Sequence, residues 1–350
     1  MASFIVSQGA KSFVASQGGR LVSLLESQGS THFRLPLAWR NPLSILYSAL
    51  NLKKIILREH ISIVHARSRA PAWAALFACR MTNTPFITTF HGTHRIQNRL
   101  KKLYNSSMVR GERVIAISHF IKNHIIENYQ VDPALIDVAP RGFNPAIFNP
   151  DLINQDAVRV LKNSIGLPEG VPILSLPGRL TRWKGQVLFL NALAQVKDLP
   201  WRALIVGGAG KKAAYLEELK SLTVKTGLSG RVFYIGDQPD IAPYYALSDV
   251  VISASTEPEA FGRVAVEAQA MRKPVIVSAH GGSLETVING ETGWYFTNGD
   301  AHDLANKIRL ALGSEDLDII GKNARKWVLK NFTIDRMCQA EWAAYLAVRG

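Results

Sequence analysis

Short apolar runs alternate with longer helical stretches along the whole chain, and this alternation restricts the fold more than any other feature of the sequence. The runs predicted to be strands are residues 12–15, 32–37, 61–66, 86–90, 113–117 and 135–139, followed by 173–176, 203–206, 232–235, 250–254 and 275–278. Stretches with helical periodicity, such as 43–59 and 71–81, lie between them. Because parallel strands need crossover connections, which are usually helices, the pattern predicts an α/β protein of two doubly wound, Rossmann-like domains.

A stretch rich in Pro, Asn and Gly, residues 141–170, separates the two series of strands. This composition is typical of a linker, and a chain of 350 residues is long enough for two hydrophobic cores. We place the boundary near Pro150, which gives domains of residues 1–150 and 151–350. The chain closes with helical stretches at 301–312, 318–330 and 334–348.

The sequence offers no candidate for a membrane span or a disulfide framework. Its longest apolar runs, such as 171–176 and 250–254, are far shorter than the ~18 residues of a spanning helix. The first ten residues have neither the basic segment nor the cleavage site of a signal peptide. Cys79 and Cys338 are expected to be buried as small hydrophobic residues. We therefore expect a cytoplasmic protein, since a reducing compartment disfavours disulfides.

Basic charge is concentrated in the first domain. Residues 1–150 carry 18 Lys and Arg against 6 Asp and Glu, a net of +12, whereas the remainder carries 23 against 21, a net of +2. The densest cluster comprises Arg95, Arg99, Lys101 and Lys102, followed by Arg110 and Arg113 and interleaved with Leu100, Leu103, Tyr104 and Met108. An amphipathic helix of this kind favours an anionic membrane surface, at the inner face of the cytoplasmic membrane; the alternative is a solvated helix face. No nucleic-acid-binding motif accompanies the charge, so we expect no nucleic acid.

One motif stands out in the second domain, where residues 257–267 read Glu-Pro-Glu-Ala-Phe-Gly-Arg-Val-Ala-Val-Glu. The preceding run is of buried-strand type and the following one is an apolar helix, so the motif lies at a strand–loop–helix junction. The unpaired N–H groups at such a helix start, here those of Phe261, Gly262 and Arg263, bind phosphates. Glu259 can then contact a group beyond the phosphates, and Glu267, two turns into the helix, can accept hydrogen bonds from a ribose. The motif predicts a nucleotide-sugar site.

Further motifs follow in a defined order: Pro177-Gly178-Arg179-Leu180 with Lys184-Gly185, then Gly281-Gly282-Ser283-Leu284-Glu285, then Gly290-Glu291-Thr292-Gly293. Together with the Glu-x7-Glu element, they make the chain resemble the family-4 retaining glycosyltransferases of GT-B fold, which have two Rossmann-like domains. The resemblance covers nearly the whole chain and is strongest from 172 to 300. It implies transfer of a sugar from a nucleotide-diphosphate sugar to a glycolipid or glycan acceptor of the lipopolysaccharide-core type, with retention of anomeric configuration and without a cofactor.

The resemblance also assigns roles to individual residues. It places Arg179 and Lys184 on the pyrophosphate, where negative charge grows as the sugar leaves. It places His91 against the transferred sugar and the nucleotide base near Gly236. It further implies that the last helix, 334–348, packs back on the first domain.

Several other residues have less specific surroundings. His65, Arg67 and Arg69, at the end of one predicted strand, are expected to face an acidic acceptor. His119 either does likewise or begins a helix with Ser118 as its N-cap, and Arg182 is interpreted as surface charge. Asp316 and Asp318 match the Asp-x-Asp of metal-dependent transferases, but their position favours helix N-terminal charge, so no metal is expected.

Two alternatives share this architecture: a nucleotide-sugar epimerase and a catalytically impaired nucleotide-sugar-binding protein. An oxidoreductase is disfavoured because no Gly-x-Gly-x-x-Gly follows a first strand. The start of the chain bears on the second alternative, since members of the resembled family open with a strand and a Gly-rich loop. Residues 1–9 instead read as the end of the next helix. We therefore expect the first domain to lack its first strand and the chain as given to transfer sugar poorly.

Overall fold

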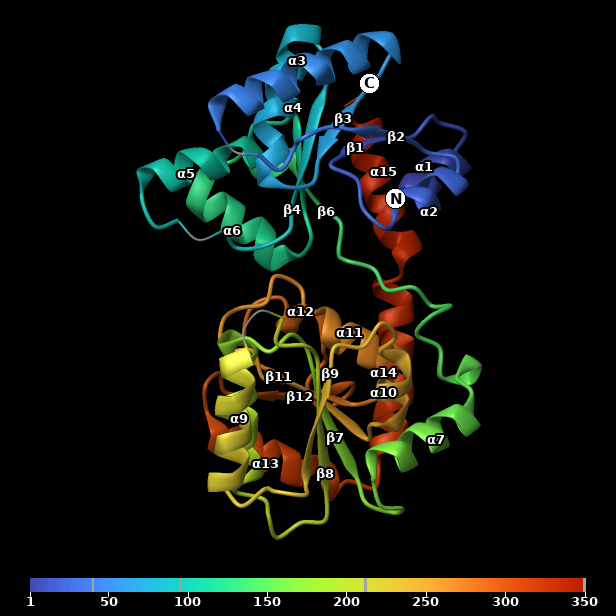
Figure 1. Ribbon diagram of the computed structural model, residues 1–350, viewed down its shortest axis with the longest axis vertical. Coiled ribbons are helices and arrows are strands. Elements are labelled where there is room, and N and C mark those ends of the chain that lie inside the picture. The colour runs from blue at the N-terminus through green and yellow to red at the C-terminus, as the bar shows by residue number, and fades with distance from the viewer. Residues whose placement is uncertain (40, 95, 211–212, 349–350) are drawn as a thin grey trace. The chain divides into compact units, whose positions relative to one another are not determined.

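The computed structural model describes residues 1–39, 41–94, 96–210 and 213–348. The chain forms two compact units, one of residues 1–140 with 335–350 and one of residues 141–334 (Figure 1). Both are built from parallel strands and helices, which confirms the predicted α/β class. The linker stretch 141–150 belongs by its contacts to the second unit, and the C-terminal helix belongs to the first.

The second unit contains one six-stranded parallel sheet in the order β12-β11-β10-β7-β8-β9. Its strands are β7 (Ile173–Pro177), β8 (Arg202–Val206), β9 (Val232–Gly236), β10 (Val250–Ser253), β11 (Val275–Ser278) and β12 (Gly293–Phe296). Its helices are η3 (Pro150–Leu152), α7 (Gln155–Ile165), η4 (Arg182–Lys184), α8 (Gln186–Leu193), α9 (Ala213–Lys225), α10 (Ala242–Leu247), α11 (Arg263–Ala270), α12 (Ser283–Thr286), α13 (Ala301–Leu312) and α14 (Leu317–Asn331). The strand order reverses between β7 and β10, and in open α/β sheets ligands bind at such a reversal.

The core of this unit explains why its strands read as continuous apolar runs. Every residue of β7, β10 and β11 is buried, because helices cover both faces of the sheet. Phe189 and Leu190 of α8 and Trp201 are fully buried against it. Burying each such side chain contributes about 1.5–3 kcal/mol to folding.

The first unit contains two parallel sheets among its described residues. Strands β1 (Phe13–Ser16) and β2 (Thr31–Arg34) pair with each other, and β3 (Val64–Ala66), β4 (Phe86–Phe90), β5 (Arg113–Ala116) and β6 (Ile136–Val138) form the second sheet. The helices are α1 (Ala2–Ser7), α2 (Val22–Ser27), α3 (Pro42–Arg58), α4 (Arg69–Thr82), α5 (Arg99–Asn105), η1 (Ser106–Val109), α6 (His119–Tyr129), η2 (Pro133–Leu135) and α15 (Ile334–Leu346). Helix α6 begins as one interpretation predicted, with the Ser118 hydroxyl accepting from the Ile121 N–H at 3.1 Å.

Helix α15 is held in the first unit by two polar contacts. The Tyr345 hydroxyl lies 2.6 Å from Nδ1 of His65, whose Nε2 lies 2.6 Å from the Thr89 hydroxyl. Arg67 makes two hydrogen bonds to the Glu341 carboxylate, at 2.7 and 2.8 Å. The expectation that His65 and Arg67 bind an acceptor stays untested by these contacts. Both side chains are engaged inside their own unit by a helix that is distant in sequence.

Arg69 is likewise engaged, donating to the Asn105 side chain at 3.0 Å. The basic cluster also differs from expectation. Arg113 lies in β5 and pairs with Asp137 at 2.5 Å, so it does not extend the amphipathic helix. That helix is short, because α5 gives way to the 3₁₀ turn η1 and Met108 is buried. Arg95 lies outside the described residues.

Buried histidines of the first unit, among them His65 and His94, make its stability depend on pH. Burial, with the nearby positive charge of Arg67 and His91, lowers the pKa of His65 well below 6.5. Burial, Arg69 and His124 lower the pKa of His94 to about 4. Below pH 6.5 the unfolded chain therefore binds protons that the folded chain does not. Each histidine then reduces the free energy of unfolding by up to about 1.4 kcal/mol per pH unit.

We expect the melting temperature to fall steadily as the pH is lowered from 6.5 to 4.5, where most carboxylates are still ionised. Thermal unfolding followed by circular dichroism would measure this. The variant His94→Gln should show a shallower dependence over the same range. A melting temperature that stays constant between pH 6.5 and 4.5 would contradict the prediction.

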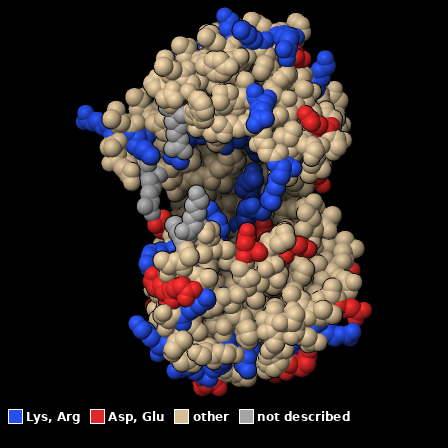
Figure 2. All heavy atoms as spheres, viewed as in Figure 1, with Lys and Arg blue, Asp and Glu red and all other residues tan. Residues whose placement is uncertain are grey.

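Surface charge and cysteine burial both follow the pattern expected from the sequence. On the face shown in Figure 2, Lys and Arg outnumber Asp and Glu over the first unit, whereas both signs are spread over the second. Cys79 and Cys338 are both buried free cysteines, as predicted. Among the helices described, none has the length and apolar character needed to cross a membrane.

Candidate functional site

The predicted strand–loop–helix junction lies where the sheet order of the second unit reverses. Arg179 and Lys184 follow β7, and Glu259 lies in the loop between β10 and α11. Glu267 lies within α11. Because β7 and β10 are neighbouring parallel strands, the segments that follow them emerge at the same edge of the sheet.

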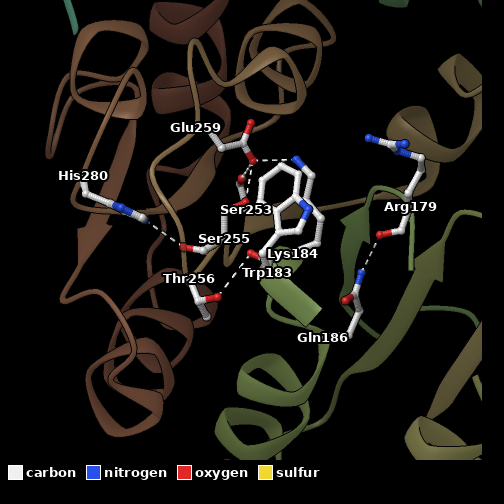
Figure 3. Close-up of polar contacts among 9 residues, drawn as sticks. All are labelled: Arg179, Trp183, Lys184, Gln186, Ser253, Ser255, Thr256, Glu259 and His280. Carbon is white, nitrogen blue, oxygen red and sulfur yellow. Dashed lines mark hydrogen bonds and ion pairs between the residues drawn. The ribbon is translucent and has the colours of Figure 1, made fainter. Parts of the chain in front are cut away.

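At the centre of this edge is an ion pair between Lys184 and Glu259. Nζ of Lys184 lies 2.7 Å from Oε1 of Glu259, and the two side chains are 14% and 9% exposed (Figure 3). The same carboxylate oxygen accepts hydrogen bonds from the hydroxyls of Ser255 at 2.5 Å and Ser253 at 3.4 Å. Charges as buried as these require partners, and each of the two is the other's partner.

Backbone contacts fix the two loops that carry this pair. The Trp183 carbonyl accepts from the Thr256 N–H at 2.7 Å and from the Thr256 hydroxyl at 3.4 Å, and these bonds join the turn after β7 to the loop after β10. Figure 3 shows the hydroxyl contact. Gly185 has a φ of 74°, and a Cβ there would lie 1.8 Å from the Ala254 carbonyl oxygen, so only glycine permits this approach. His280 contributes a further contact, with Nε2 2.8 Å from the Ser255 carbonyl oxygen.

Arg179 and Arg182 differ in their surroundings although they are close in sequence. Arg179 is exposed, and its carbonyl accepts from the side chain of the fully buried Gln186 at 3.1 Å (Figure 3). Arg182 instead makes two hydrogen bonds to Glu218, at 2.8 and 2.6 Å, and lies over the Tyr215 ring. Arg182 is thus paired surface charge, as predicted. Lys184 Nζ lies over the Trp183 ring, 4.4 Å from its centre.

Glu267 is held by a second set of contacts. Its Oε1 lies 2.6 Å from the Arg263 guanidinium, and its Oε2 accepts from the Tyr245 hydroxyl at 3.1 Å. Tyr245 is fully buried; burial and the adjacent Glu267 carboxylate raise its pKa well above 10, so the phenol remains a hydrogen-bond donor. No sequence motif singles out Tyr245, because it lies on α10, outside all of the motifs described above.

The start of α11 is built around Phe261 and Gly262. The Phe261 ring packs edge-on against Phe332, with 5.4 Å between the ring centres. Gly262, the N-cap residue, has a φ of 91°, a backbone conformation that residues other than glycine rarely adopt. Arg263, the first residue of the helix, has a largely exposed side chain. The helix start has the form expected of an anion site, and phosphate binding there remains a prediction.

The other predicted residues belong to other segments of the chain. His91 follows β4 directly, in the first unit, close enough to His65 to influence its pKa. Gly236 ends β9 with a φ of 78°. Asp316 is the N-cap residue of α14 and Asp318 lies in its first turn, paired with Lys322 at 2.5 Å, in agreement with the interpretation as helix charge. Within the described ranges, no group of three or more His, Cys, Asp or Glu could hold a metal ion.

Comparison with known proteins identifies relatives of both units. Residues 1–147 match the family model Glycosyltransferase Family 4, and residues 158–327 match Glycosyl transferases group 1. The crystal structure of a glycosyltransferase from Rickettsia africae ESF-5 is similar over 98% of this chain and 92% of that one, with 36% identity and a TM-score of 0.91.

Two further comparisons concern proteins with more specific names. The lipopolysaccharide core biosynthesis mannosyltransferase LpcC of Rhizobium leguminosarum bv. viciae is 31% identical over 189 residues, or 53% of each chain. The matched stretch thus spans about half the length of that curated relative. Anabaena HepE in complex with UDP-glucose shares the fold, with a TM-score of 0.82, 23% identity, and coverage of 99% of this chain and 94% of that one.

Proposed function

Because the chain belongs to the family-4 glycosyltransferases of GT-B fold, we propose that it transfers a sugar from a nucleotide-diphosphate sugar to a glycan or glycolipid acceptor, with retention of configuration. The observation that carries the proposal is the Lys184–Glu259 ion pair at the strand-order reversal. Glu267, which is paired with Arg263, follows Glu259 closely in the chain. A cation, two carboxylates and a helix start along one edge of a sheet suit a donor made of sugar, phosphates and ribose.

We propose that the donor redistributes the contacts of this pair. A pyrophosphate offers Lys184 a stronger charge-assisted partner than a single carboxylate, and the exposed Arg179 can bind the same group. Glu259 would then accept hydrogen bonds from sugar hydroxyls, still oriented by Ser253 and Ser255. The complex of HepE with UDP-glucose supports a nucleotide-sugar donor for this fold.

In the proposed reaction, the bond between the anomeric carbon and the β-phosphate oxygen breaks. The acceptor oxygen bonds to the same carbon on the same face, and the acceptor proton passes to the departing phosphate oxygen. Lys184, Arg179 and the start of α11 stabilise the negative charge that develops on the phosphate, so they act more strongly in the transition state than in the ground state. We assign His91 to a hydroxyl of the transferred sugar.

For the acceptor, we propose a lipopolysaccharide-core type glycan at the inner face of the cytoplasmic membrane. The support is the similarity to LpcC and to the lipopolysaccharide 1,2-N-acetylglucosaminetransferase of Salmonella typhimurium, which is 29% identical over 188 residues. The basic first unit complements an anionic acceptor or lipid surface.

The test is release of nucleoside diphosphate from a panel of nucleotide-sugars, with and without lipopolysaccharide-core acceptors, followed by NMR of the product linkage. Acceptor-dependent release with retained configuration is the expected result. Interconversion of the donor sugar without an acceptor would indicate an epimerase. Donor binding without any turnover would indicate a nucleotide-sugar-binding protein.

The Tyr245 hydroxyl gives the ribose assignment a specific test. We expect Tyr245→Phe to weaken nucleoside-diphosphate binding about tenfold, because the Glu267 carboxylate loses a hydrogen bond of about 1.5 kcal/mol that orients it. Isothermal titration calorimetry measures the affinity. The neighbouring Tyr244→Phe, whose ring packs with Leu161 and Ile165 in a separate cluster, is the matched control. Equal affinities of the two variants would exclude a role for Tyr245.

A further inference from the structure

Helix α3 (Pro42–Arg58) presents apolar side chains to solvent along its length. Leu43, Leu50 and Leu57 are spaced seven residues apart, so they lie on one face, and they are 80%, 45% and 55% exposed. Leu46 and Tyr47 are also exposed. We call these five residues the α3 stripe. The opposite face, comprising Ser48, Ala49, Leu52 and Ile56, is buried where α3 packs along α4 (Figure 1).

The stripe is not needed to hold the helix in place. The buried face of α3 already provides the contact with α4, and Asn41 caps the helix by accepting from the Ser44 N–H at 2.8 Å. Trp39, just before the helix, is also exposed, at 59%. Single exposed leucines are common, but a row of large apolar side chains on one helix face indicates an interaction surface.

The charge around the stripe indicates its partner. Helix α3 contains Lys53, Lys54 and Arg58 and no Asp or Glu, but its C-cap residue Glu59 pairs with Arg58 at 2.7 Å. Residues 1–150 carry a net charge of +12. Two copies of so basic a unit repel each other at low ionic strength, whereas anionic headgroups attract it. An apolar face with Lys and Arg alongside is the pattern of a helix that lies in the surface of a membrane.

We propose that the α3 stripe inserts into the interfacial layer of an anionic bilayer, with Lys53 and Lys54 contacting the headgroups. Helix α3 is a better candidate for membrane insertion than α5. Helix α5 has only seven residues, and its exposed large apolar side chains are Leu100 and Leu103. The inference rests on the proposed function and deepens it, because binding to the membrane would bring the protein to a lipid-linked acceptor. Trp39 precedes the N-terminal end of α3, the end at which the stripe begins with Leu43.

The experiment is flotation of the purified full chain with vesicles of phosphatidylcholine containing 30% phosphatidylglycerol, and with phosphatidylcholine alone. The test variant carries Leu43→Gln, Leu50→Gln and Leu57→Gln, since glutamine is polar yet a good helix former. The matched control carries Val160→Gln, Val224→Gln and Leu310→Gln, three exposed apolar positions on helices of the second unit.

We expect the wild type and the control to bind the anionic vesicles and the test variant to bind about tenfold or more weakly. Wild-type tryptophan emission should shift to the blue with anionic vesicles, and Trp39→Phe should reduce that shift. Nucleoside-diphosphate affinity should be the same in all variants. Failure of the membrane proposal is thereby distinguished from failure of the nucleotide-sugar proposal, which would appear as absent nucleotide binding in the wild type.

Three results would overturn the inference. The first is no binding of the wild type to anionic vesicles at low salt. The second is unchanged binding of the test variant. The third is a wild-type dimer in light scattering that becomes monomeric in the test variant while vesicle binding stays the same, which would assign the stripe to a second copy of the chain.

Discussion

Replacing Lys184 by Ala is expected to lower the rate of sugar transfer by about 10²- to 10³-fold, the usual effect of removing one group that stabilises developing charge. The reason is that Lys184 is a largely buried cation at the strand-order reversal, with its Nζ 2.7 Å from Oε1 of Glu259. Negative charge on the leaving pyrophosphate grows along the reaction, so turnover should fall more than donor affinity. Single-turnover kinetics with saturating donor would measure the chemical step separately from binding.

The variant has a second effect that must be separated from the first. Without Lys184, the Glu259 carboxylate keeps the Ser253 and Ser255 hydroxyls but loses its ion pair, which lowers the free energy of unfolding. Thermal unfolding of Lys184→Ala, Glu259→Ala and the double variant gives their coupling. Lys220→Ala, which removes an exposed partner of Glu217, is the matched control for turnover. Normal turnover in Lys184→Ala would place the pyrophosphate site elsewhere.

Replacing Glu267 by Ala is expected to weaken nucleoside-diphosphate binding by about 10- to 150-fold, which corresponds to the loss of a charge-assisted hydrogen bond of about 1.5–3 kcal/mol. Glu267 is nearly buried and already held by Arg263 and Tyr245, so its position needs little further ordering when a ribose binds. Calorimetric titration of the variant gives the loss directly.

Two companion variants define the cause of that loss. Glu267→Gln keeps the shape and one acceptor oxygen, so its affinity should fall between those of the wild type and Glu267→Ala. Glu217→Ala removes an exposed carboxylate on α9 and should leave affinity unchanged. Wild-type affinity in Glu267→Ala would rule out the ribose assignment.

The elements that the sequence predicted well are those determined by local pattern. Strands β4 and β11 and helix α13 have the predicted limits, because continuous apolar runs and helical periodicity depend only on neighbouring residues. Strand β12 was missed, since it begins at a glycine that we interpreted as part of a loop motif. The junction of β10 and α11 was predicted correctly for the same local reason.

Contacts between distant segments could not be predicted in this way. The ion pair of Lys184 with Glu259 joins residues 75 positions apart, and the Arg67–Glu341 contact joins residues 274 apart. Ser253 and Ser255 had one usable signal, since alternate residues at the end of a strand point the same way, toward Glu259. Tyr245 had none, because its role depends on a hydrogen bond to Glu267, a residue of another helix 22 positions further along the chain.

The return of α15 to the first unit determines when that unit can be completed during synthesis on the ribosome. Residues 141–334 are made between the two parts of the first unit, and at about 5–20 residues per second the roughly 200 residues take about 10–40 s. Throughout that time Ile87, Ile115 and Ala139 lack the cover of Ala344 and Tyr345. The second unit, continuous in sequence, can fold first. The nascent first unit therefore displays an apolar sheet face, and chaperones that bind such faces should associate with it until the last helix emerges.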